Sequence, residues 1–260
     1  MEFSRGGRVL LMGIVNVTPD SFSGDGLADD PEAAIRLGLE MAAAGADIVD
    51  VGGESTRPGH QTVPAEIEIE RAVPVVRRLA EAGLVVSIDT SKLEVAGAAA
   101  DAGAAIVNDV WGLRRAPGIA GLAAARGLGL VLMHNQSGHH YADLMTEIVA
   151  SLGESVRAAE AAGVPRSRLA IDPGIGFGKT AEQNLVVLQE LHRLAELELA
   201  VLVGVSRKSF LGKLFGQQGE ERIRGTAAAV TAAILRGADI VRVHDVAVMK
   251  NVLQVAEALR

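Results

Sequence analysis

The chain has 260 residues, no cysteine, 49% hydrophobic residues and a formal net charge of −7 at pH 7. The hydrophobic content excludes intrinsic disorder, and the acidic balance argues against binding to duplex nucleic acid, which requires a basic surface. Without cysteine there are no disulfides, thiolate zinc sites or cysteine nucleophiles, so any bound metal must have oxygen or imidazole ligands.

The N-terminal segment does not resemble a targeting sequence. An apolar stretch follows Arg8, but it is short and ends at Asn16, with no small-residue cleavage site behind it. We therefore expect a cytoplasmic protein with no membrane span.

Eight short apolar runs follow one another along the chain. They consist mostly of unbroken Val, Ile and Leu, the pattern of parallel strands that are covered on both faces. The runs cover residues 9–15, 47–52, 85–89, 105–108, 129–133, 169–172, 200–205 and 239–243.

Alanine-rich amphipathic stretches between the runs have the start and stop signals of helices. Asp30 before Pro31 opens the first helix, and Pro64 opens the second. Thr180 and Gln183 have the spacing of a capping box for a later helix. Glycines are expected to end helices at Gly45, Gly83, Gly103, Gly127, Gly163 and Gly237.

Eight strand-then-helix units without a linker predict one closed (β/α)8 TIM barrel, a single domain over residues 1–260. The alternative is an open doubly wound sheet, but no glycine-rich dinucleotide fingerprint follows the first run. The active site of a barrel lies at the carboxyl ends of its strands, so the residues after each run are the candidate site.

Every predicted strand ends in a polar or charged group. In chain order these are Asn16, Asp50, Asp89, Asn108, His134, Asp172, the segment SRKS (206–209) and the segment RVHD (242–245). A helix cap or turn explains any one of them, and we retain that interpretation for Asp109 and Asp245. Eight together predict a rim that binds a ligand.

The charges on this rim indicate the kind of ligand. Cationic donors follow strands seven and eight, where barrels often bind phosphate: Lys208, Arg242 and His244. Acceptors follow strands three, four and six: Asp89, Asn108 and Asp172. Burying a carboxylate costs free energy unless a hydrogen-bond donor contacts it. The pattern predicts a heterocyclic head with a donor-rich edge, such as a 2-amino-pyrimidinone, and an anionic tail.

Seven motifs, in order, resemble those of the dihydropteroate synthase family. The longest are MGIVNVTPDSFSGDG (12–26) and GADIVDVGGESTRPG (45–59), followed by SIDT, NDVWGL, DPGIGFGKT, GVSRKSFLG and RVHDV. The resemblance covers essentially the whole chain. It implies a transferase that joins 4-aminobenzoate to 6-hydroxymethyl-7,8-dihydropterin diphosphate in folate biosynthesis, with Mg²⁺ as cofactor. It also implies small-molecule substrates, no nucleic-acid or membrane partner, and a homodimer.

The resemblance assigns roles to the rim. It implies that Asp89, Asn108 and Asp172 bind the pterin edge and that Lys208 donates to the ring's carbonyl side. Arg242 is expected along the ring face, reaching the diphosphate together with His244. Lys208, Arg242 and His244 are thus the catalytic candidates, acting by positioning and leaving-group stabilisation, and no residue is a covalent nucleophile.

The remaining roles concern the metal and the second substrate. Asn16 is implied as the protein ligand of Mg²⁺, which takes its other oxygens from diphosphate and water. Thr56 and Arg57, in the loop GGESTRPG, are expected to close over the diphosphate and help to form the 4-aminobenzoate pocket. Phe177 and Ser209 are expected to line that pocket.

Two other functions stay open at this point. One is a pterin-dependent methyltransferase domain, which lacks the two long loop motifs and the Ser-Arg-Lys run. The other is a non-catalytic paralogue of the synthase. His139 and His140 are interpreted as a solvated loop, and His134 as either a packed barrel residue or a ligand contact. Lys179 does not have the spacing of a phosphate-binding loop.

Overall fold

The computed structural model describes residues 1–18, 30–55 and 62–260. Eight parallel strands close into a barrel in chain order, β8 pairing with β1. They are β1 (Leu10–Asn16), β2 (Ile48–Gly52), β3 (Val86–Asp89), β4 (Ile106–Asp109), β5 (Gly129–Met133), β6 (Leu169–Asp172), β7 (Ala200–Gly204) and β8 (Ile240–Val243). The predicted TIM barrel is confirmed and the open sheet is excluded.

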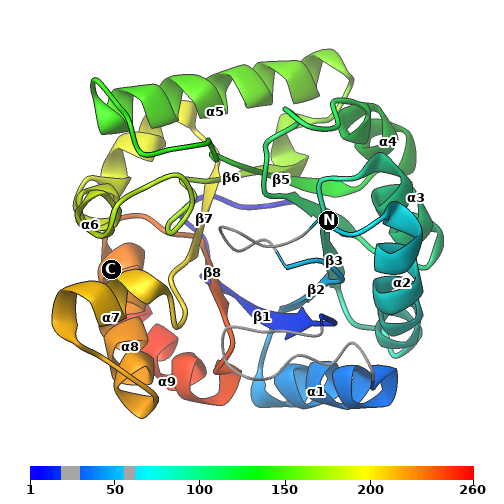
Figure 1. The fold of residues 1–260 in the computed structure, drawn as a ribbon, viewed down its shortest axis with the longest axis horizontal. Coiled ribbons are helices and arrows are strands. Elements are labelled where there is room, and N and C mark those ends of the chain that lie inside the picture. The colour runs from blue at the N-terminus through cyan, green and yellow to red at the C-terminus, as the bar shows by residue number, and fades with distance from the viewer. Residues whose placement is uncertain (19–29, 56–61) are drawn as a thin grey trace.

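Helices surround the barrel (Figure 1). They are α1 (Pro31–Ala44), α2 (Ala65–Glu81), α3 (Leu93–Asp101), α4 (Gly118–Arg126), α5 (Leu144–Ala161), α6 (Ala181–Gln189), α7 (Ser209–Phe215), α8 (Glu220–Leu235) and α9 (Val246–Ala258), with 3₁₀ turns η1 (Arg166–Arg168) and η2 (Leu191–Leu197). Within the described ranges, no helix is long and apolar enough to cross a bilayer.

The predicted helix ends are confirmed. The Asp30 side chain accepts from the Ala33 backbone N–H at 2.8 Å, and Thr180 and Gln183 form the complete capping box. Gly45 and Gly127 end α1 and α4 in the left-handed conformation that favours glycine.

The unit between β7 and β8 differs from the prediction, because it contains two helices, α7 and α8, in place of one. Gly216 and Gly219, with φ of 67° and 48°, turn the chain between them. Since such angles are costly for other residues, the glycines end α7 and let α8 begin in a new direction.

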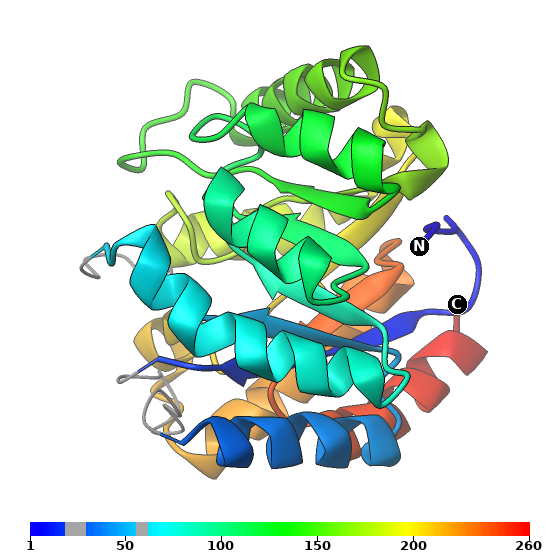
Figure 2. The ribbon, with the colours of Figure 1, turned by 90° about the vertical axis from the view of Figure 1, so that its right-hand side faces the viewer.

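The barrel interior is filled by apolar side chains from the strands and by Phe3 of the N-terminal segment. The Phe3 backbone N–H donates to the Ser167 carbonyl at 2.8 Å, which holds this segment against the amino ends of the strands. Figure 2 shows both chain termini at this end of the barrel. The filled amino end leaves the carboxyl ends of the strands as the place for a polar site.

Candidate active site

An arginine joins two buried carboxylates at the carboxyl end of the barrel. Arg242 Nε on β8 donates to Asp50 Oδ2 at 2.6 Å, and its Nη2 donates to Asp89 Oδ2 at 2.8 Å. Asn108 Nδ2 also donates to Asp50 Oδ2, at 3.0 Å. The closed barrel thus places side chains from β2, β3, β4 and β8 in one hydrogen-bonded group.

Each carboxylate in this group has one oxygen that is buried and accepts no hydrogen bond within the described ranges. Asp50 Oδ1 and Asp89 Oδ1 have no hydrogen-bond partner in the described part of the chain. Burial raises the pKa of Asp89 to about 7, although Arg242 opposes the shift. A buried acceptor without a donor costs roughly 1–3 kcal/mol, so a ligand with N–H donors would recover that free energy.

A lysine follows β7, the strand that pairs with β8 and so neighbours Arg242. Lys208 Nζ donates to the Ile175 carbonyl and lies 4.4 Å from the centre of the Phe177 ring. Burial lowers the pKa of Lys208 to about 8, although Asp172 opposes the shift. Asp172 Oδ1 accepts from the Gly174 backbone N–H at 2.7 Å, and burial raises the pKa of this carboxyl group. Ser209 begins α7 directly after Lys208 and is half-buried.

The turn that presents Lys208 is held from two elements. Arg207 has a positive φ of 54°, and its backbone N–H donates to Thr226 Oγ1 of α8 at 3.0 Å. Its guanidinium pairs with Asp245, with Nε 2.9 Å from Oδ2. This pair agrees with the structural interpretation of Asp245. A left-handed arginine is strained, and these contacts stabilise the turn in that conformation.

His244 adjoins this turn from the end of β8. Its ring Nδ1 lies 3.0 Å from Ser206 Oγ, and its backbone N–H donates to the same oxygen at 3.1 Å. The bond to Ser206 fixes the ring orientation. The predicted donors after strands seven and eight are therefore held by contacts between the two strand ends.

The predicted metal ligand and the loop after β2 are only partly described. Asn16 ends β1 and is half-buried, whereas Thr56 and Arg57 lie outside the described residues. No cluster of three His, Asp or Glu side chains suited to a metal occurs in the described ranges.

Sequence reasoning missed an ion-pair network beside the loop after β2. Lys92 Nζ lies 2.5 Å from Glu54 Oε2 and 2.5 Å from Glu68 Oε2 on α2. Glu54 Oε2 also accepts from the Val63 backbone N–H at 2.9 Å. The network joins the two ends of the segment between Glu54 and Val63. No spacing rule relates these residues, so only the fold reveals the network.

Asp50 and Lys179 are buried polar residues whose partners the sequence did not predict. Asp50 was noted as a strand end, but its bond to Arg242 spans 192 positions of the chain. Lys179 is 5% exposed and its Nζ lies 3.0 Å from His134 Nδ1. Burial lowers the pKa of His134 to about 3, which supports a packed, neutral histidine. His139 and His140 are exposed, as predicted.

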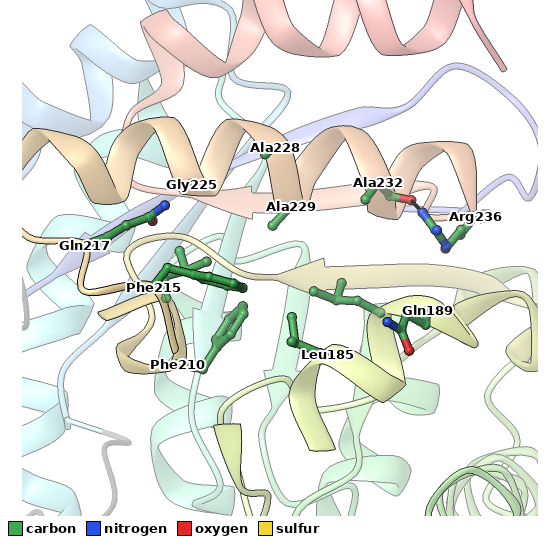
Figure 3. Close-up of a pocket in the computed structure, with 12 residues that line it drawn as sticks. Leu185, Gln189, Phe210, Phe215, Gln217, Gly225, Ala228, Ala229, Ala232 and Arg236 are labelled. Atoms are coloured by element: carbon green, nitrogen blue, oxygen red, sulfur yellow. Dashed lines mark hydrogen bonds between the residues drawn. The ribbon is translucent and has the colours of Figure 1, made fainter. Parts of the chain in front are cut away.

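An apolar pocket of about 370 Å³ lies outside the barrel, among α6, α7 and α8. Figure 3 shows Ala229 of α8 facing Leu185 and Phe210 across it. None of the predicted site residues lines this pocket. Its apolar lining has no grouped acceptors or cations, so the strand ends remain the candidate active site.

A closed parallel barrel with carboxylates, an amide, a lysine and an arginine at its carboxyl end defines a barrel enzyme for a polar heterocyclic ligand. Residues 12–244 match the family described as pterin binding enzyme. Dihydropteroate synthase of Bacillus subtilis (strain 168) is 44% identical over 253 residues, which cover 97% of this chain and 89% of that protein.

Solved structures agree with this match. Dihydropteroate synthase from Clostridium difficile, crystallised in the presence of pteroic acid, has a TM-score of 0.93 and 41% identity, covering 99% of this chain and 98% of that one. The enzyme from Xanthomonas albilineans has TM-scores of 0.91 with 4-aminobenzoic acid and 0.86 with 7,8-dihydropteroate, at 47% and 44% identity, covering 97% of this chain and 93% of that one. The chain belongs to the pterin-binding enzymes and, among them, to the dihydropteroate synthase family.

Proposed function

We propose that this chain joins 4-aminobenzoate to 6-hydroxymethyl-7,8-dihydropterin diphosphate, giving 7,8-dihydropteroate and diphosphate. The observation that supports it best is the pair of buried, unpartnered oxygens on Asp50 and Asp89, as far as the structure describes the chain. The 2-amino-pyrimidinone edge of a pterin presents N–H donors that match such acceptors. The Xanthomonas relative binds 4-aminobenzoic acid and 7,8-dihydropteroate, the second substrate and the product of this reaction.

The proposed pterin contacts use both sides of the rim. Asp89, Asn108 and Asp172 bind the donor-rich edge of the ring, with Asp50 as a further acceptor, and Lys208 donates to its carbonyl side. Arg242 keeps its bonds to one oxygen of each aspartate and presents its planar group to the ring and the diphosphate, a dual role that suits guanidinium. His244 is the second donor to the diphosphate.

The proposed chemistry needs no covalent intermediate with the protein. The amine nitrogen of 4-aminobenzoate attacks the methylene carbon of the pterin, the carbon–oxygen bond to diphosphate breaks, and the nitrogen then loses a proton. Arg242, His244 and Lys208 are the catalytic residues, because they hold the pterin and stabilise the charge on the departing diphosphate. Alignment of the two substrates supplies the rest of the rate enhancement.

We propose Mg²⁺ as the cofactor, with Asn16 as its protein ligand. The amide oxygen of Asn16, at the end of β1, is a hard ligand of the kind that Mg²⁺ prefers. A single protein oxygen fits Mg²⁺, which keeps several waters and binds substrate phosphates. When bound, the ion would neutralise charge on the diphosphate.

The second substrate occupies the outer part of the site in this proposal. Phe177 and Ser209 line the 4-aminobenzoate side, next to Lys208 in the structure. Thr56 and Arg57 bind the diphosphate and complete the pocket, and this part of the proposal rests on sequence alone.

We also propose a cytoplasmic homodimer. Phe215 and Leu235 are 57% and 45% exposed on α7 and α8, which border the apolar pocket. Burying such side chains against a second copy would remove apolar area from water. Light scattering that gives only monomer mass at micromolar concentration would contradict the dimer.

The decisive experiment measures diphosphate release after both substrates are mixed with the protein and Mg²⁺. Release that requires 4-aminobenzoate and gives one dihydropteroate per diphosphate is expected. Release without 4-aminobenzoate would indicate hydrolysis. Methyl transfer from a methylated pterin would support the methyltransferase alternative, which the synthase relatives disfavour. Tight pterin binding without turnover would identify a non-catalytic paralogue.

A further inference from the structure

Lys179 is a buried lysine that the proposed chemistry does not use. Its ammonium group lies 3.0 Å from His134 Nδ1 and donates to the carbonyls of Gly174 and Phe177 at 3.1 Å each. Burial lowers the pKa of Lys179 to about 7, and in its protonated form these contacts use all three of its hydrogens. No carboxylate in the described ranges forms an ion pair with it, so its partners are one ring nitrogen and two backbone carbonyls.

The loop that accepts these bonds, residues 173–179, also forms the wall beside Lys208. Its Ile175 carbonyl accepts from Lys208 Nζ, and its Phe177 ring lies beneath the same ammonium group at 4.4 Å. A Cβ atom at Gly176 would come within 2.8 Å of Lys208 Cδ. A shift of the loop would therefore move the contacts that orient Lys208.

The opposite side of the loop packs on the segment after β5. A Cβ atom at Gly174 would lie 1.9 Å from the His134 carbonyl oxygen, so only glycine fits there. Tyr141 Oη donates to the Gly178 carbonyl at 2.8 Å. The loop is thus held between the β5 segment and Lys208, and Lys179 bonds to both the loop and His134.

We propose that Lys179 is a positioning residue that sets the place of Lys208 in the pterin site. It acts by holding the Gly174 and Phe177 carbonyls against His134, which fixes the Ile175 carbonyl and the Phe177 ring. This inference rests on the proposed function of the site. Burial keeps His134 neutral, with a pKa of about 3, so its Nδ1 can accept the bond.

The test compares Lys179→Met with the matched control Lys213→Met, since Lys213 is an exposed lysine on α7. We expect Lys179→Met to weaken binding of pteroic acid, measured by calorimetry, and to lower kcat/KM for the dihydropterin diphosphate, each by about tenfold or more. Lys213→Met should stay within about twofold of wild type. A lower Tm for Lys179→Met with unchanged pteroic acid affinity would overturn the proposal, because it would mean a structural role only.

A double-mutant cycle separates positioning from general damage. If Lys179 acts through Lys208, Lys179→Met should have a much smaller effect on pteroic acid affinity when Lys208 is already alanine. Equal effects in both backgrounds would contradict the inference. If the methionine variant does not fold, Lys179→Gln, which is too short to reach all three acceptors, replaces it with the same expectations.

The outcome also distinguishes this inference from the proposed function. Wild-type protein that binds no pteroic acid and releases no diphosphate would contradict the proposed function itself. Wild-type protein that does both, with Lys179→Met equal to it, would contradict only the role of Lys179.

Discussion

Asp239 at the amino end of the barrel and the pair Asp50 and Asp89 at the carboxyl end differ in how their buried oxygens are bonded. At the amino end, Asp239 is 2% exposed and both of its oxygens are bonded. Oδ1 accepts from the Gly6 N–H at 2.8 Å and from Arg260 at 3.0 Å, and Oδ2 accepts from the Val201 N–H at 3.0 Å. At the carboxyl end, Asp50 and Asp89 bond through Oδ2, and their Oδ1 atoms have no partner in the described chain.

This difference separates a structural carboxylate from one that is available for a ligand. Burial alone does not distinguish them, because all three aspartates are almost inaccessible to solvent. Native proteins rarely leave buried acceptors without donors, so these atoms, on two carboxylates that bond to the same arginine, need an explanation. A ligand with matching donors would explain them, whereas Asp239 needs nothing beyond the fold.

The largest expected effect is at the carboxyl end, in the variant Lys208→Ala. Loss of one preorganised donor should cost about 2–4 kcal/mol of transition-state stabilisation, or roughly 30- to 1000-fold in kcat/KM. Circular dichroism should show an intact fold. A kcat/KM within a few-fold of wild type, on folded protein, would remove Lys208 from the site.

At the amino end the expected effect is on stability. Asp239→Ala leaves two backbone N–H groups and Arg260 without their acceptor, which should lower the free energy of unfolding by about 2–3 kcal/mol. Activity per folded molecule should stay unchanged, since Asp239 lies at the opposite end of the barrel from the site. Urea unfolding and active-site titration measure the two quantities. A loss of kcat without a loss of stability would reverse the comparison between the two ends.

The pH dependence of ligand binding should reflect the ionisation of Asp89 and Lys208 at the carboxyl end of the barrel. Burial raises the pKa of Asp89 to about 7, and ligand donors favour the carboxylate. Affinity for pteroic acid should therefore fall by up to about tenfold per pH unit below pH 7, where a proton must be displaced. It should fall again above about pH 8, where Lys208 loses its charge.

Two variants separate the limbs of this profile. Lys208→Ala should lose the alkaline fall and keep the acid one, whereas Asp239→Ala should keep both. Calorimetric titrations from about pH 5.5 to about pH 9.5 give the profiles. A flat profile for the wild type would show that neither group bonds to the ligand in its charged form.

The smallest expected effect concerns the proposed metal ligand. Asn16→Ala should raise the Mg²⁺ concentration for half-maximal activity several-fold, because diphosphate and water supply most of the coordination shell. Activity at saturating Mg²⁺ should approach the wild-type value. Wild-type activity that persists in excess EDTA would eliminate the metal from the proposal.

The sequence by itself determined the barrel, most helix ends and the polar residues of the rim. These depend on local rules: apolar runs form buried parallel strands, Asp30 and Thr180 cap helices, and strand ends of a barrel meet at one rim. The division of residues 205–239 into two helices was missed, because it depends on the backbone angles of Gly216 and Gly219. The single domain over 1–260 and the residue roles at the rim stay predictions.

Only the tertiary structure decided which polar residues are partners. Arg242 bonds to Asp50 and Asp89 across 192 and 153 positions, and Lys179 reaches His134 across 45. No local pattern encodes such pairs, because they depend on barrel closure and on the depth of each side chain. The same burial raises the pKa of Asp89 and lowers that of Lys208, since loss of water disfavours the charged form of both an acid and a base.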